Sequence, residues 1–569
     1  MTSRSTSSRW FRLLALLLGL SLLAAACGDD DDGGSATPDT DDGSGDQTDT
    51  ETETEAEDEG EPQPGGSLVY GLEADTATPW TPAKSVCAIS CHMVMRSVFD
   101  PLTLYGEDET VQPNLLESFE ANEDNTQWTL TPREGVVFHD GTPFDAAAIV
   151  ANLEAHKASF LTAKALLQME SVALSEDGAS AVVTMSSPWG NFPVFLSGQI
   201  GYMASPTWLE AAAGDTAQEA RPVGTGPFVF QSYEPGGSFV ATKNADYWRA
   251  DEGLPYLDRI EYRVLADAQA RKNALLSGDI DIMHSSSGEV ISELRDASGI
   301  ELDETTAYGE TNYTLMNVGD PESHLSDVRV RRALAHALDS QVLIDRRGAG
   351  IGQVANGPFS PDQVGHLDDT GYPEYDPDEA KRLLDEYKEE TGNSTVEIAY
   401  TTTTDPANLQ TAELLKQFWE QVGFSIPLAQ IEQGQFIITA LTGDFEMFGW
   451  RNHGGVNPDS QRIWWHSETA DDFGALALNF GRIKDEVIDE NLDIIRASDD
   501  EAEVQEAAEA INRQFGEQAY NLWSSWTVWG IGKKPDVNGL NAFTLPDGSP
   551  TIYGNGIGGS HQVAQLWRG

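Results

Sequence analysis

A change of hydrophobic period within residues 128–157 constrains the fold more than any other feature of the sequence. The stretch reads WTLTPREGVVFHDGTPFDAAAIVANLEAHK. Apolar and polar residues alternate between Trp128 and Phe138, as in a half-buried pair of strands, and apolar residues then recur at helical spacing between Ile149 and Leu153. Asp140-Gly141 is a turn pair, and Asp145 is placed to cap the helix. We therefore predict a hairpin, a tight turn and an amphipathic helix.

Helical and strand patterns also alternate in the second half of the chain. They predict helices at 377–391 and 407–422, strands at 396–401 and 445–450, and a helical tail at 485–520. This alternation indicates an α/β fold. The 505 residues from Gly65 onward are enough for two large lobes or three smaller domains.

The N-terminus predicts secretion. Three Arg residues precede an apolar run at 13–26 that ends in small residues just before Cys27. The run is shorter than the ~20 residues that a membrane-spanning helix needs. It resembles a bacterial lipobox, although Ala24 occupies the position where Leu is usual. We expect a signal peptide over 1–26 and lipidation of Cys27; the alternative is ordinary secretion with a free Cys27.

An acidic segment follows the leader. Residues 28–64 contain sixteen Asp or Glu and no Lys or Arg, and such a segment buries too little apolar surface to fold. We expect residues 27–66 to form a disordered tether that holds the folded part away from a membrane. The rest of the chain has 77 acidic and 31 basic residues, a charge that repels nucleic acid and anionic membrane surfaces. A solvated acidic shell explains this charge as well as a cationic ligand does.

Ordered motifs in the first half resemble one known family. Residues 133–143 read REGVVFHDGTP, 224–228 read GTGPF, 277–281 read SGDID and 328–339 read VRVRRALAHALD. Blocks of this kind, in this order, resemble the family 5 extracytoplasmic solute-binding proteins, the receptors of peptide- and nickel-type ABC importers. One departure is Ala148, where that family usually has Asp.

The resemblance implies a two-lobe α/β fold of the type II periplasmic-binding-protein class. The chain would cross twice between the lobes, near 304–312 and 525–531, and these two crossing segments would act as the hinge. The expected lobe I covers 67–308, with an inserted subdomain at about 106–220. Lobe II is expected at 309–528, and residues 529–569 would return to lobe I.

Cys87 and Cys91 lie in SVCAISCH, near the start of the first lobe. An oxidising exterior permits a disulfide between them. With His92 they are alternatively metal ligands, although structural metal sites normally need a fourth ligand. We expect a disulfide, no metal and no cofactor.

Enzyme motifs do not support a catalytic role. The sequence has no HExxH, GxSxG or Walker pattern. Residues 554–559 fit GxGxxG in letters, but only ten residues remain after them, too few for a dinucleotide-binding unit. We expect a non-enzyme with no catalytic residues, and a secreted hydrolase is the alternative from a different class.

The resemblance also places the ligand site. Peptide-binding relatives have a Trp followed three residues later by an Asp that holds the α-ammonium group, and here Trp450 is followed by His453. A neutral His binds an ammonium group far less strongly than a carboxylate does. Arg451, if it points inward, favours an anionic or neutral group. Aromatic faces suit peptide side chains, sugars and cations alike. The predicted ligand-binding residues are Trp450, Arg451, His453, Trp464, Trp465 and Tyr308, whereas Trp523, Trp526 and Trp529 are expected mainly to pack in the core.

These observations together predict a monomeric receptor, lipid-anchored on the extracytoplasmic face of the membrane. It would capture a small solute between two lobes and deliver it to ABC permease subunits. Peptide-like solutes are the first expectation, oligosaccharides or other small organic solutes the second, and nickel complexes the third.

Overall fold

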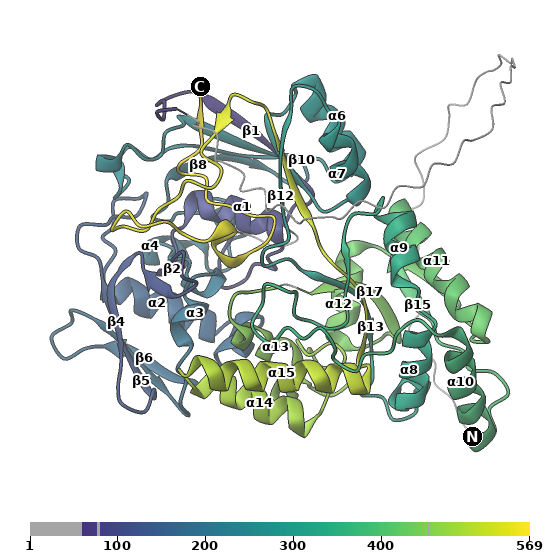
Figure 1. Ribbon diagram of the computed structural model, residues 1–569. Coiled ribbons are helices and arrows are strands. Elements are labelled where there is room, and N and C mark those ends of the chain that lie inside the picture. Colours follow the sequence, from purple (N-terminus) through teal and green to yellow (C-terminus); the bar gives the residue numbers. More distant parts are fainter. Residues whose placement is uncertain (1–59, 77–79, 453) are drawn as a thin grey trace, which may run out of the picture. The chain divides into compact units, whose positions relative to one another are not determined.

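The computed structural model describes residues 60–76, 80–452 and 454–569. The expected signal peptide, Cys27, most of the tether and His453 lie outside these residues. Within the described part, the chain builds two large sheets, a four-stranded sheet and two two-stranded sheets, β2-β3 and β20-β21 (Figure 1). No helix in the described ranges is both long and apolar enough to span a membrane.

The first large sheet has seven strands in the order β12-β19-β11-β1-β10-β9-β8. Its strands are β1 (Ser67–Leu72), β8 (Phe228–Glu234), β9 (Ser238–Lys243), β10 (Arg259–Val264), β11 (Ile282–Ser285), β12 (Glu301–Thr305) and β19 (Trp529–Lys533). Leu68 and Tyr70 of β1 pack in one core with α1 (Ile89–Val98), and Val69 packs on the core that holds α6 (Ala268–Ser277) and α7 (Gly288–Arg295). Successive side chains of β1 point to opposite faces of the sheet, and helices cover both of these faces.

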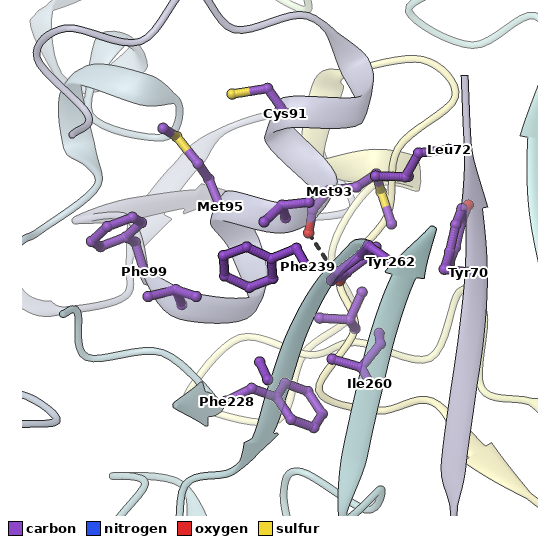
Figure 2. Packing of buried hydrophobic residues seen from close by; sticks show 14 of the residues in the cluster. Tyr70, Leu72, Cys91, Met93, Met95, Phe99, Phe228, Phe239, Ile260 and Tyr262 are labelled. Carbon is purple, nitrogen blue, oxygen red and sulfur yellow. Dashed lines mark hydrogen bonds between the residues drawn. The ribbon is translucent and has the colours of Figure 1, made fainter. Parts of the chain in front are cut away.

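Figure 2 shows the core beneath α1. Met93 and Met95 of this helix lie against Phe239 and Ile260 of the sheet, and the Tyr262 hydroxyl donates to the Met93 carbonyl oxygen at 3.0 Å. That bond gives the buried phenol a partner.

The second large sheet has six strands in the order β14-β18-β13-β17-β15-β16. Its strands are β13 (Thr311–Met316), β14 (Gln353–Val354), β15 (Tyr400–Thr403), β16 (Leu428–Ile431), β17 (Met447–Asn452) and β18 (Asn521–Trp526). One face packs on α8 (Val328–His336), α10 (Pro377–Thr391) and α11 (Pro406–Val422). The other face packs on α12 (Gln433–Thr442), α14 (Glu486–Ala497) and α15 (Glu501–Gln518). The remaining helices of this lobe are α9 (Ser340–Arg347) and α13 (Arg462–Trp465).

A four-stranded sheet, β4-β5-β7-β6, forms the inserted subdomain with α2 (Ala146–Lys157) packed on it. Its strands are β4 (Leu116–Ala121), β5 (Gln127–Pro132), β6 (Met169–Leu174) and β7 (Ala181–Met185). The short elements around it are β2 (Thr103–Tyr105), β3 (Val111–Pro113), η1 (Thr162–Leu166), α3 (Phe192–Phe195), η2 (Gln199–Gly201), α4 (Pro206–Ala212) and α5 (Thr216–Glu219). The short elements elsewhere are η3 (Ala250–Glu252), η4 (His324–Ser326), η5 (Pro458–Gln461), η6 (Ser467–Thr469), β20 (Val537–Asn538), η7 (Tyr553–Gly556) and β21 (Trp567–Arg568).

The chain passes between the two large sheets twice. Residues 306–310 lead from β12 to β13, and residues 527 and 528 lead from β18 back to β19. The first sheet therefore contains strands from both ends of the chain, whereas the second sheet is built from one continuous segment.

Three expectations need correction. Residues 136–138 do not pair with β5, whose partners are β4 and β7. Val136 and Phe138 are buried, and this stretch forms only an isolated bridge, Val137 to Pro143, across the Asp140-Gly141 turn. The expected strand at 396–401 begins at Tyr400, and the single helical tail is two helices, because Asp500 caps a new helix through the backbone N–H groups of Ala502 and Glu503. The expected cap of α2 is confirmed: the Asp145 side chain accepts from the Ala148 N–H.

Candidate functional site

Both crossings meet at the guanidinium of Arg451. Arg451 lies near the end of β17, opposite Asn312 of β13 in the sheet register. Its Nε lies 2.6 Å from a carboxylate oxygen of Glu310, in the first crossing. Its Cζ lies 5.2 Å from the ring centroid of Trp529, which follows the second crossing. The central strand of the second sheet thus places one cation where the two sheets are connected.

The first sheet supplies two further partners. Glu73 follows β1 and Ser286 follows β11. These two strands are adjacent and parallel, so their C-terminal ends lie on the same side of the sheet. Arg451 Nη1 donates to Ser286 Oγ at 2.6 Å, and Nη2 donates to Glu73 Oε1 at 3.3 Å. Arg451 therefore bonds to both sheets.

Burial and charge at this cluster act in opposite directions on Glu73. Burial by itself would raise the pKa of Glu73, but the positive charge of Arg451, assisted by His284 and Arg271, lowers it below its ordinary value of 4.5. Burial lowers the pKa of His284 to about 4, so this ring is neutral at pH 7. Its Nε2 lies 3.3 Å from Ser90 Oγ, and its Nδ1 lies 3.1 Å from the Gly559 carbonyl oxygen. The cluster is thus close to electrically balanced.

Water reaches the members of the cluster unequally. The side chains of Arg451 and Glu73 are 30% and 21% exposed, whereas Glu310 is 3% exposed. The Glu310 carboxylate that pairs with Arg451 is therefore buried. The longer contact between Arg451 and Glu73 lies between two partly exposed side chains, and it is the part of the cluster that a solute can reach. Arg451 was predicted as a cation that favours an anionic solute; two carboxylates already oppose its charge, which weakens that preference.

The predicted tryptophans divide into two groups. Trp450 stacks on Phe436 with centroids 5.5 Å apart and meets Phe480 edge-on at 5.0 Å. Trp464 meets the same Phe480 at 5.5 Å, and both tryptophans are partly exposed. These two indole rings lie close together and are accessible to a solute.

Trp465 points elsewhere. It is 3% exposed and packs against Phe359 and Phe515. Its position is explained by packing alone, and its role in ligand binding stays a prediction. The core assignment of Trp523, Trp526 and Trp529 is confirmed by their burial.

Tyr308 lies in the first crossing, with its hydroxyl 2.6 Å from Glu109 Oε1. It packs with Tyr105, Val456 and Ile552 and not in the cluster of Trp450. Tyr308 has a positive φ of 52°, a conformation that costs energy in a residue with a side chain. Its position ties the crossing to the inserted subdomain.

Cys87 and Cys91, for which the sequence leaves a disulfide or a metal site open, form a disulfide bond. Among the residues that the structure describes, no three His, Cys, Asp or Glu side chains are grouped so that they could hold a metal ion.

Sequence reasoning missed Glu73, Ser286 and Glu310. Glu73 and Ser286 follow parallel strands at a shared sheet edge, where ligand-binding groups of α/β proteins commonly gather. That rule would have pointed to them once the strand order was known. Nothing local marks Glu310, which precedes β13 in an irregular segment.

Solved structures share this architecture. A periplasmic binding protein, AgaA from A. tumefacien R10 in complex with agropinic acid, superposes with a TM-score of 0.73 at 24% identity, covering 84% of this chain and 94% of that one. DppA from Helicobacter pylori in complex with the peptide STSA gives a TM-score of 0.77 at 20% identity, covering 89% and 98%. The predicted fold class, a two-lobe type II periplasmic-binding-protein fold with two crossing segments, is confirmed.

Sequence comparison then fixes the family. The model of bacterial extracellular solute-binding proteins, family 5 (middle region), matches residues 110–474, more than half of the chain. The glutathione-binding protein GsiB of Salmonella typhi is 29% identical over 348 residues, which are 60% of this chain and 65% of that protein. This chain belongs to the family 5 bacterial extracellular solute-binding proteins. It spans slightly less than two thirds of the length of this curated relative.

Proposed function

We propose that this protein is the extracytoplasmic receptor of an ABC importer, which captures a small solute between its two lobes and delivers it to membrane permease subunits. The observation that carries the proposal is the cluster at Arg451. One partly exposed cation bonds to the ends of two strands in the first sheet and to the crossing that leads into the second. Closing the lobes on a solute would assemble contacts from both sheets around it.

Peptide-like solutes are the leading class. The partly exposed Arg451 and Glu73 present one cation and one carboxylate side by side, an arrangement suited to a solute that carries both charges. Reduced glutathione is the first compound to test, because the GsiB relatives are named as glutathione-binding proteins.

An oligosaccharide is the second candidate. The partly exposed indole rings of Trp450 and Trp464, which both contact Phe480, support it, since sugar rings pack on indole faces.

The receptor is proposed to be a monomer and a non-enzyme, anchored through a lipid on Cys27. The leader at 1–26, the acidic tether at 27–66 and the lobe boundaries at 308 and 528 belong to the same proposal. The acidic tether would then hold the lobes above the membrane that contains the permease.

Native mass spectrometry of the purified full-length chain tests the function. A receptor is expected to carry a stoichiometric small molecule that is released on unfolding. Isothermal titration of the emptied protein with reduced glutathione, a dipeptide and a trisaccharide then identifies the class. Arg451→Met is expected to weaken the binding of a zwitterionic peptide at least tenfold, and Arg382→Met, an exposed arginine of α10, serves as the control. Conversion of any of these compounds into a product would contradict the non-enzyme assignment.

A further inference from the structure

The inserted subdomain touches the second lobe through a short loop, residues 189–191. The Gly190 N–H donates to the Arg496 carbonyl oxygen at 2.8 Å. The Asn191 side-chain amide donates to the carbonyl oxygens of Ile495 and Ser498, at 2.6 and 3.3 Å. The last carbonyl groups of a helix have no partner within the helix. Here the C-terminal end of α14 obtains its missing donors from another part of the molecule.

Trp189 in the same loop covers a buried ion pair. Arg496 Nε donates to Asp459 Oδ1 at 2.9 Å, and Trp189 Nε1 donates to the other oxygen of the same carboxylate at 2.9 Å. The Arg496 Cζ atom lies 4.0 Å from the Trp189 ring centroid. Trp189 and Asp459 are both 0% exposed and Arg496 is 3% exposed. A charged pair withdrawn this far from water is stable only while all its partners are in place.

Gln168 and Lys164 extend the contact. Arg496 donates to the Gln168 side-chain oxygen, and the Gln168 amide donates to both oxygens of Glu468 at 3.1 Å. Lys164 pairs with Asp471 at 2.7 Å where the contact reaches solvent. The subdomain thus supplies partners to Arg496, Asp459, Glu468 and Asp471 of the second lobe.

Two apolar side chains join the cores of the subdomain and the second lobe. Leu161 packs against the core of the second lobe, and Ile463 packs against the cores on both sides. The remaining contacts described above are hydrogen bonds, ion pairs and the stacking of Arg496 on Trp189. The net contribution of the hydrogen bonds to stability is modest, because water replaces them on separation. Such a contact can open and close, whereas a large apolar interface would hold the two parts together permanently.

The loop contact is joined to the candidate site along the chain. Asn457 donates to the Asn191 side-chain oxygen at 3.1 Å, and Asp459 lies eight residues after Arg451. Arg451 and Asp459 are thus close in the sequence, and one lies in the partly exposed cluster while the other lies under Trp189.

We propose that loop 189–191 and the C-terminal end of α14 form a latch that holds the inserted subdomain against the second lobe in the closed receptor and releases it when the lobes open. The latch sets the balance between open and closed forms at a place that the solute does not contact. The inference rests on the proposed lobe closure. Its test uses no solute, so its failure is distinct from a failure to bind.

The test compares Asn191→Ala and Asn191→Asp with the wild type, using the purified full-length chain. The aspartate keeps the shape of the side chain but removes its donors and places a negative charge beside the carbonyl end of α14, where the helix dipole disfavours it. Hydrogen–deuterium exchange is measured at residues 189–191 and 495–498, and the radius of gyration is measured by small-angle X-ray scattering. The control is Asn393→Ala, a partly exposed asparagine that follows α10 in the second lobe and whose side chain bonds to Thr391.

In Asn191→Ala we expect exchange in both segments to rise about tenfold, since hydrogen bonds to the helix end are lost. Asn191→Asp should raise it further, and the radius of gyration should increase in both variants. The control should match the wild type. Faster exchange at an unchanged radius would mean local fraying of a permanent interface and would overturn the latch. An unchanged rate in both variants, or the same increase in Asn393→Ala, would also overturn it.

Discussion

Two arginines of the second lobe contact different parts of the first lobe: Arg451 contacts the large sheet and Arg496 the inserted subdomain. Arg451 sits where both crossings meet, 30% exposed, with a sealed bond to Glu310 and a longer one to Glu73. Arg496 sits under Trp189, 3% exposed, and its bond to Asp459 is closed to water. At Arg451, a solute can replace the partly exposed contact with Glu73. At Arg496, no charged contact among the described residues is exposed for a solute to replace. From this comparison we infer that Arg451 takes part in solute recognition and Arg496 in lobe closure.

The largest effect is expected for Asp459→Ala. This change leaves Arg496 buried without its carboxylate, which typically costs about 3–5 kcal/mol. Urea-induced unfolding measures the loss. Asp385→Ala removes an exposed partner of Lys381 on α10 and should cost far less. Equal losses in the two variants would show that the Arg496 site is not sealed in solution.

The next effect concerns pH at the Arg451 site. The buried His284 ring has its pKa lowered to about 4 by burial first, with Arg271 and Arg451 adding to the shift and Glu73 opposing it. Between about pH 4 and 6.5 the unfolded chain binds the proton and the folded chain does not, so stability falls as the pH drops through this window. We expect His284→Asn to remove up to about 3 kcal/mol of that pH dependence. Parallel curves of unfolding free energy against pH for wild type and variant would contradict this assignment.

A smaller effect is expected for Glu73→Gln. The lowered pKa of Glu73 means that its contribution is fully present above its ordinary pKa of 4.5 and is lost as the pH falls through its lower folded value. The variant should be less stable by about 1 kcal/mol at pH 7, and the difference should disappear in acid. Glu117→Gln, in an exposed pair with Arg133, is the control. A difference that persists at low pH would show that the contact is not electrostatic.

The smallest effect is expected for Lys164→Met. Its pair with Asp471 lies at the solvent-exposed edge of the latch, where ion pairs contribute less than about 1 kcal/mol and are weakened by salt. Unfolding at low and high salt should show a small difference that vanishes in salt. A loss comparable to that of Asp459→Ala would mean that the edge, and not the buried pair, dominates the contact.

Local features were predictable from the sequence where local physics decides them. The Asp145 cap, the helix at 377–391 and the turn at Asp140-Gly141 follow from residue type and spacing. The Ser498–Asp500 break in the helical tail had a visible signal, an Asp placed to cap the helix that follows it, which a purely periodic reading overlooks. The same periodic interpretation predicted that residues 136–138 pair with the strand at 128–130, whereas they form only an isolated bridge with Pro143.

The site depends on contacts that leave no local trace. Arg451 is separated from Glu73 by 378 positions, and Arg496 from Gln168 by 328. Each pair exists only because two distant strands or a loop and a helix are brought together. The family motif drew attention to Trp450 and Arg451, but it carried no information about their partners in this chain.

The position of β19 has a consequence for how the chain acquires its structure. This strand lies between β11 and β12, which do not pair with each other, although both precede it by more than 220 residues. The chain is synthesised from its N-terminus. Until residue 533 has been made, β12 therefore has no partner strand and the seven-stranded sheet is incomplete. The six-stranded sheet waits almost as long, because β18, which lies between β14 and β13, ends only at Trp526. We therefore expect both large sheets to be completed at nearly the same late point of synthesis.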